Sequence, residues 1–136
     1  MRFIDTNIFI RFFTGDDSVK AQACRQLLLR IEAGEERATT SESVIAEVVF
    51  VLRSKRHYDI GASRVRDLFA PLLSLPGLHV QDKKRFLRAL DLMASQPFLD
   101  FEDALSAVHM QRLGIDEIYS YDRDFDRVSD IVRVEP

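Results

Sequence analysis

The chain has little of several residue types that mark specialised proteins. Its 136 residues include one cysteine, no tryptophan, four prolines and five glycines. The single Cys24 cannot form an internal disulfide, which agrees with a reducing compartment. No apolar run approaches the roughly 20 residues that cross a membrane, and Asp5 leaves no room for the apolar region of a signal peptide. We therefore expect a cytoplasmic protein without a membrane partner, folded as one domain over residues 1–136.

The chain also lacks an excess of positive charge. Its 19 basic and 22 acidic side chains give a net charge of −3. This balance argues against broad electrostatic adhesion to nucleic acid and leaves room only for a local basic patch. The densest basic segment contains Arg53, Lys55, Arg56 and His57. These side chains either contact phosphate or form a solvated helix end, where the helix dipole favours cations.

Short strand-like segments alternate with helical patterns along the whole chain. Apolar and β-branched residues predict strands at 2–4, 37–40, 78–81, 117–121 and 131–134. Apolar residues at helical spacing predict helices at 8–13, 16–32, 41–54, 60–75, 82–95 and 100–113. Helical crossovers of this length join parallel strands, so the pattern predicts an α/β fold with a largely parallel sheet of about five strands.

Two aspartates follow predicted strands directly. Asp5 comes after the first strand and Asp122 after the fourth. Because ligand crevices of open α/β sheets lie at the carboxyl ends of parallel strands, the two carboxylates are expected to face each other. Each also precedes a helical run, so the alternative is that each only caps a helix.

Glu47 is the only charged residue between Val44 and Leu52. The run reads as largely buried, and an ionised carboxylate there must be paired, bound to a metal or shifted in pKa. The alternative is that Glu47 lies on one exposed stripe of the helix.

Three more acids, Asp100, Glu102 and Asp103, open the last long helical pattern. Acids in a first helical turn are favoured by the helix dipole, so their presence alone says little about function. Asp100 and Asp103 are three residues apart and share a helix face, and the small Ala104 and Ala107 would let the helix pack closely on a sheet. Asp103 is therefore a candidate for a site at the strand ends.

Carboxylates gathered in one crevice would repel one another unless a divalent cation neutralised them. The candidate ligands are all oxygen atoms, which favours Mg²⁺ or Mn²⁺ over zinc. His57, His79 and His109 show no partner arrangement, and we expect solvated or core-edge positions for them.

Four segments resemble, in order, the sequence blocks of PIN-domain ribonucleases, and most closely the small VapC-type toxins of toxin–antitoxin pairs. The segments are 5–7, 43–52, 100–105 and 120–125. The resemblance implies a three-layer α/β/α fold with a five-stranded parallel sheet. It also implies hydrolysis of RNA phosphodiester bonds with Mg²⁺ or Mn²⁺, inhibition by an antitoxin protein, and a possible homodimer.

The residues that match the family's acidic quartet are Asp5, Glu47, Asp103 and Asp122. The resemblance implies that Asp5, Asp103 and Asp122 are metal ligands and that Glu47 is a ligand or orients the attacking water. Asp100 and Asp124 match acids that only some members use. Ser120 stands where many relatives have threonine, which keeps a hydroxyl at that position.

Two other functions are weighed against the nuclease. A non-catalytic acidic α/β module would use its aspartates as caps and dock a partner protein through apolar helices. Phe9, Phe12 and Phe13 either contribute to such a surface or pack in the core. A phosphatase or phosphoacceptor usually needs an acidic pair at the first strand, but Asp5 is followed by Asn7, and no glycine-rich phosphate loop is present.

Overall fold

Five short strands, all paired in parallel, form two separate sheets in the computed structural model, which describes all 136 residues. The first sheet contains β1 (Arg2–Phe3), β2 (Ala38–Thr39) and β3 (Leu78–His79) in that order. The second contains β4 (Glu117–Tyr119) and β5 (Val132–Val134). The predicted α/β class, the number of strands and their parallel direction are confirmed. The strands do not form the one continuous sheet that was expected.

Six α-helices and one 3-10 helix connect these strands. They are α1 (Thr6–Thr14), α2 (Ser18–Glu32), α3 (Glu42–Arg53), α4 (Ala62–Leu73), α5 (Lys83–Ser95), α6 (Phe101–Leu113) and η1 (Arg123–Arg127). Each α-helix overlaps the segment predicted from helical spacing. At five helix starts a side-chain oxygen accepts a free backbone N–H, which removes the cost of an unpaired donor. These capping residues are Asp5, Asp17, Ser41, Asp100 and Asp122.

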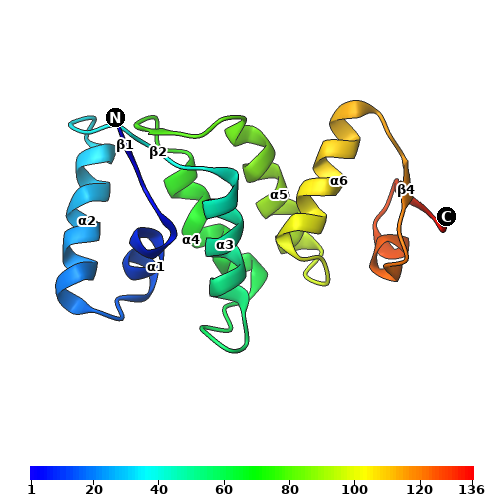
Figure 1. Cartoon of the computed structure of the whole chain (residues 1–136), viewed down its shortest axis with the longest axis horizontal. Helices are drawn as coiled ribbons and strands as arrows, with labels where there is room; N and C mark the ends of the chain where they lie inside the picture. The colour runs from blue at the N-terminus through cyan, green and yellow to red at the C-terminus, as the bar shows by residue number, and fades with distance from the viewer.

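The main core lies between the first sheet and the helices around it. Phe9 and Phe69 are fully buried, with ring centroids 5.4 Å apart. Phe12 and Phe13 are partly buried against the same core, so the aromatic run of α1 packs inside, as its core-packing alternative predicted. Cys24 is buried as a small residue of α2. In Figure 1, α2 lies to one side of β1, and α3 and α4 lie to the other.

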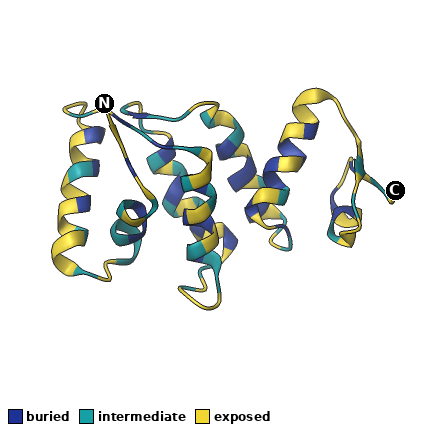
Figure 2. Cartoon of the chain, in the orientation of Figure 1, coloured by how far each residue is buried: buried dark blue, intermediate teal, exposed yellow.

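Helix α6 separates the main core from a smaller one. Phe101, Ala104, Leu105 and Val108 belong to the main core. The other face of α6 packs against the C-terminal unit, which we define as residues 115–136. This second cluster consists of Leu99, Ala107, Met110, Phe125, Val128 and Ile131. The molecule is consequently elongated, with α5 and α6 between the first sheet and β4 (Figures 1 and 2). None of its helices is both long and apolar enough to cross a membrane.

Candidate functional site

The first group of candidate acids lies where β1 ends and α1 begins. Asp5 is exposed, and its Oδ1 accepts the N–H of Ile8 at 3.3 Å. The next residue, Thr6, donates its hydroxyl to Oε2 of Glu47 at 2.9 Å. This bond joins the start of α1 to the middle of α3, so Asp5 and Glu47 project from adjacent elements. We call these two acids the β1 pair.

Glu47 is exposed, so the expectation of a buried carboxylate is wrong and the alternative of an exposed stripe is confirmed. Its helix buries one side only and leaves the stripe that holds Ser43, Glu47 and Phe50 open to solvent. The residues of the buried side are Ile45, Val48, Val49 and Leu52. Glu47 therefore needs no internal cation, and Thr6 is its recorded hydrogen-bond partner.

The second group of acids lies where α6 begins and where β4 ends. Asp100 caps α6 by accepting the N–H of Asp103 at 2.8 Å. Asp122 caps η1 by accepting the N–H of Asp124 at 2.9 Å. Burial raises the pKa of Asp103 to about 6, and the nearby carboxylates of Asp100, Asp122, Asp124 and Glu102 contribute to the shift. We call Asp103 and Asp122 the α6 pair.

The two pairs do not meet in one chain. No set of three or more His, Cys, Asp or Glu side chains is placed to hold a metal ion. The expected convergence of Asp5, Asp103 and Asp122 therefore does not occur in this structure. The physical reason is the position of β4, which lies on the far side of α6 from β1 (Figure 1). The donor atoms are carboxylate oxygens, which are the ligands that a hard cation prefers, and in this structure they stand in two separate pairs.

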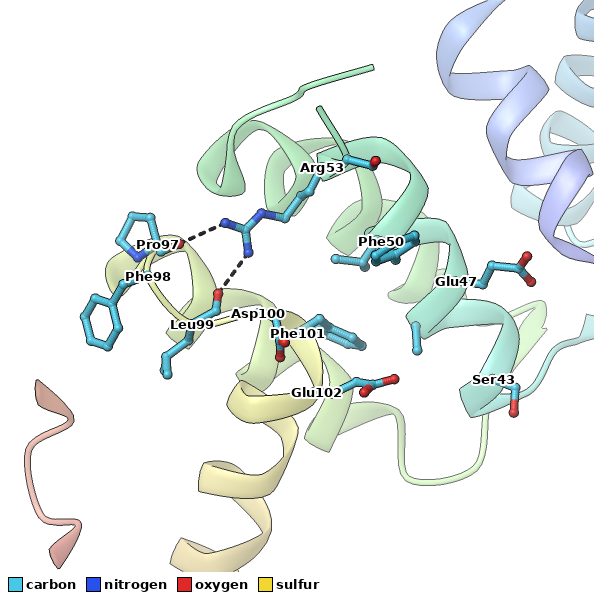
Figure 3. A pocket seen from close by; sticks show the side chains of 13 residues that line it. Ser43, Glu47, Phe50, Arg53, Pro97, Phe98, Leu99, Asp100, Phe101 and Glu102 are labelled. Atoms are coloured by element: carbon cyan, nitrogen blue, oxygen red, sulfur yellow. Dashed lines mark hydrogen bonds between the residues drawn. The ribbon is translucent and has the colours of Figure 1, made fainter. Parts of the chain in front are cut away.

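A cavity of about 710 Å³ opens between α3 and the start of α6, next to Glu47. Figure 3 shows Phe50 and Phe101 on its walls, with Asp100 and Glu102 at the α6 side. Phe50 is 68% exposed and was not singled out from the sequence. The sequence does indicate that Phe50 lies beside Glu47, because residues three apart in a helix are neighbours on the same face.

Arg53 does not belong to a free basic patch. Its guanidinium donates to the carbonyl oxygens of Leu99 and Pro97, both at 2.9 Å, and so ties α3 to the loop before α6 (Figure 3). Burial lowers the pKa of Arg53, although it remains a strong base. The exposed cations of the segment are Lys55 and Arg56.

The histidines take the peripheral positions that were expected. His57 and His109 are exposed, and His79 at the end of β3 is bonded through Nε2 to the guanidinium of Arg37.

The raised pKa of Asp103 predicts a pH-dependent stability in EDTA. A carboxyl group whose pKa is higher in the folded protein holds its proton more tightly there, so the stability it contributes is lost as the pH rises from about 4 to 6. We expect Asp103→Asn, which stays neutral, to raise the free energy of unfolding at pH 7.5 by about 1 kcal/mol after allowance for solvent screening. At pH 4 the gain should disappear. Urea unfolding at both pH values measures the difference, and an equal gain at both would contradict the assignment.

Comparison with known proteins adds three findings. The family model described as PIN domain matches residues 2–131. A protein named VapC ribonuclease from Aquifex aeolicus (strain VF5) is 24% identical over 128 residues, which cover 94% of this chain and 92% of that protein. The crystal structure of Mycobacterium tuberculosis VapC20, described as a sarcin-ricin loop cleaving toxin, aligns over all of both chains with 20% identity and a TM-score of 0.41.

Proposed function

The chain belongs to the PIN-domain family, and from that premise we propose that it is a metal-dependent endoribonuclease, the toxin of a toxin–antitoxin pair. The VapC ribonuclease of Aquifex aeolicus, which aligns over nearly the full length of both proteins, supports the choice of RNA as the substrate. The proposed reaction is hydrolysis of a phosphodiester bond. The proposed catalytic residues are Asp5, Glu47, Asp103 and Asp122.

The observation that carries this proposal is the crowding of carboxylates around Asp103 at the start of α6. Burial raises the pKa of Asp103 to about 6, and the charges of Asp100 and of Asp122, which belongs to a different element 19 residues further along the chain, add to the shift. Such crowding of like charges disfavours the ionised form and is relieved when a cation binds. Perturbed carboxyl groups of this kind are typical of functional sites rather than of solvated surfaces.

We propose Mg²⁺ or Mn²⁺ as the cofactor, with Asp5, Asp103 and Asp122 as its ligands. When bound, a divalent ion supplies a more acidic water and neutralises charge on the phosphate. Backbone N–H groups already orient two of these carboxylates. One oxygen of Asp5 accepts the N–H of Ile8, and one oxygen of Asp122 accepts the N–H of Asp124. Glu47 is held by the Thr6 hydroxyl, which fixes its carboxylate relative to Asp5.

We propose that the cavity beside Glu47 receives unpaired RNA. The ring of Phe50, which is 68% exposed on the wall of this cavity, offers aromatic surface of the kind on which unstacked bases of single-stranded RNA stack. Lys55 and Arg56, which follow the same helix, supply the nearest exposed positive charge in the sequence for phosphate groups. The same open, partly apolar cavity is where we propose that a segment of the antitoxin binds and blocks RNA.

Metal removal tests the proposed function. We expect purified protein treated with EDTA to cleave a structured RNA at least about tenfold more slowly than the same protein in Mn²⁺ or Mg²⁺, because several carboxylates in one site repel phosphate unless they are neutralised. Gel analysis of end-labelled RNA measures the rates. If RNA remains intact in both ions and Mn²⁺ does not raise the melting temperature, the chain is a protein-binding module and not a nuclease.

A further inference from the structure

One acid in the cavity between α3 and α6 has no partner within the chain. The carboxylates that line this cavity are those of Glu47, Asp100 and Glu102. Glu47 accepts the hydroxyl of Thr6, and Asp100 accepts a backbone N–H of α6. Glu102 is exposed, and Figure 3 shows its side chain extending from the start of α6 toward α3 without a hydrogen bond. Both oxygens of Glu102 are therefore available to a ligand.

An aromatic ring lines the same cavity. Phe50 of α3 is 68% exposed and shares the cavity wall with Glu102. The volume of about 710 Å³ is in the range of pockets that hold small ligands. Aromatic side chains of this kind stack on unpaired bases. A planar ligand can consequently lie on Phe50 while one of its edges meets Glu102.

The two free oxygens of Glu102 distinguish among the four RNA bases. A carboxylate accepts two hydrogen bonds side by side, one at each oxygen. Guanine presents two adjacent donors on its Watson–Crick edge, the N1–H and the N2 amine. Adenine and cytosine present an amine next to a ring nitrogen that accepts, and uracil presents one N–H between two carbonyl groups. Each of these three bases would place an acceptor against the carboxylate, so guanine is the base that fits.

A second cavity continues the first toward the start of α3. Its volume is about 480 Å³, and Ser43, Ala46 and Glu102 line both cavities. Arg85 lies in its wall, where Nη2 donates to Oε2 of Glu42 at 2.8 Å and Nε has no hydrogen-bond partner. A guanidinium carries five N–H donors, so Arg85 keeps donors for a phosphate group.

Positive charge consequently lies near both ends of α3. Arg85 is bound to Glu42 at its start, and Lys55 and Arg56 follow its end. Phosphate groups on either side of one bound base match this arrangement. A lone cationic side chain could also meet Glu102, but Arg85 would repel it. The charges around the cavity therefore favour a nucleotide within a strand.

We propose that this cavity is a guanine site. The base stacks on Phe50, its N1–H and N2 amine donate to Glu102, and a neighbouring phosphate meets Arg85. This inference rests on the proposed function, because it assigns a base preference to the RNA that enters the cavity. Glu102 is accordingly a specificity-determining residue and takes no part in the hydrolysis itself.

Binding of short single-stranded RNA in EDTA tests the guanine site without cleavage. Fluorescence anisotropy at low ionic strength compares labelled pentanucleotides that hold guanine, inosine, adenine or cytosine between uridines. Inosine lacks only the N2 amine of guanine, so wild type should bind it about tenfold more weakly. Adenine and cytosine should bind no better than inosine. Equal affinity for guanine and inosine, or no binding of any of the four, would overturn the proposal.

Glu102→Gln tests which side chain recognises the base. Glutamine keeps the size of the side chain but turns an NH₂ group toward one donor of guanine, so the preference over inosine should fall to about twofold or less. Glu32→Gln is the control, because it removes the same charge from an exposed side chain of α2, outside the cavity. It should keep the wild-type preference. The ratio of two affinities is compared, so any general gain in RNA binding from the lost charge cancels. An unchanged preference in Glu102→Gln would refute the assignment.

Phe50→Ala tests the stacking surface. It should weaken binding of the guanine RNA at least about fivefold, whereas Phe50→Tyr, which keeps a ring, should bind as wild type does. Equal binding by Phe50→Ala and Phe50→Tyr would contradict the site. Displacement of the RNA by an equal concentration of free arginine would show that the cavity takes a cation and not a base.

The outcome separates this site from the proposed function. A guanine preference in a protein that cleaves no RNA in Mn²⁺ or Mg²⁺ would refute only the nuclease. Metal-dependent cleavage without a guanine preference would refute only the guanine site.

Discussion

Asp5→Asn should reduce the rate of RNA cleavage by about 100-fold or more while the melting temperature without metal stays within a few degrees of wild type. Asparagine caps a helix as well as aspartate does, so the bond from the Ile8 N–H to this side chain is kept. What disappears is one negative charge in the proposed metal site. The rate should be measured in saturating Mn²⁺, together with the Mn²⁺ affinity by titration calorimetry.

Asp17→Asn is the matched control for this variant. Asp17 caps α2 by accepting the Lys20 N–H at 3.0 Å, so it has the same structural role and loses the same charge. Because Asp17 belongs to neither acidic pair, its variant should cleave RNA at the wild-type rate. Cleavage by Asp5→Asn at the rate of Asp17→Asn would mean that Asp5 is only a helix cap, and the nuclease proposal would lose its central residue.

Phe125→Ala should release the C-terminal unit from α6. Phe125 is 4% exposed in a cluster of only six buried residues, and it is the only aromatic residue among them. Removing a buried phenylalanine ring costs about 3–5 kcal/mol, which exceeds what so small a cluster can lose and stay folded. We expect residues 115–136 to exchange their amide hydrogens rapidly. RNA cleavage should fall at least about tenfold, because Asp122 is no longer held near Asp103.

Tyr121→Ala is the control for Phe125→Ala, because it also removes an aromatic ring from the C-terminal unit but removes one that is exposed. Tyr121 lies four residues from Phe125 and is 71% exposed, so its removal should leave hydrogen exchange in residues 115–136 unchanged. Hydrogen exchange followed by mass spectrometry compares the two variants segment by segment. Protection that survives in Phe125→Ala would show that the second cluster does not hold the unit on α6.

The local elements of the fold could be predicted from the sequence because their causes are local. Apolar spacing placed every α-helix, and the caps at Asp5, Asp100 and Asp122 agree with the preference of helix starts for short polar or acidic side chains. The exposure of Glu47 could not be decided in the same way. An apolar run with one charge is compatible both with a buried carboxylate and with the exposed stripe that Ser43, Glu47 and Phe50 form.

The grouping of the acids depends on contacts between distant parts of the chain. The rule that parallel strands carry their ligands at one edge assumes that the strands share a sheet. Here the four candidate acids fall into two pairs because α6 packs between two cores, and the apolar pattern of α6 does not show which face meets which core. Likewise, Arg53 reads as a free cation in sequence, whereas its partners are carbonyl groups 44 and 46 residues away.

The position of α6 between the two cores has a consequence for the order in which parts of the protein open. The main core contains 23 buried residues, whereas the second cluster contains six. A region with fewer buried apolar contacts opens at a lower free energy, so residues 115–136 should detach from α6 before the main core unfolds. Heat or denaturant should therefore separate Asp122 from Asp103 while Asp5 and Glu47 still keep their places.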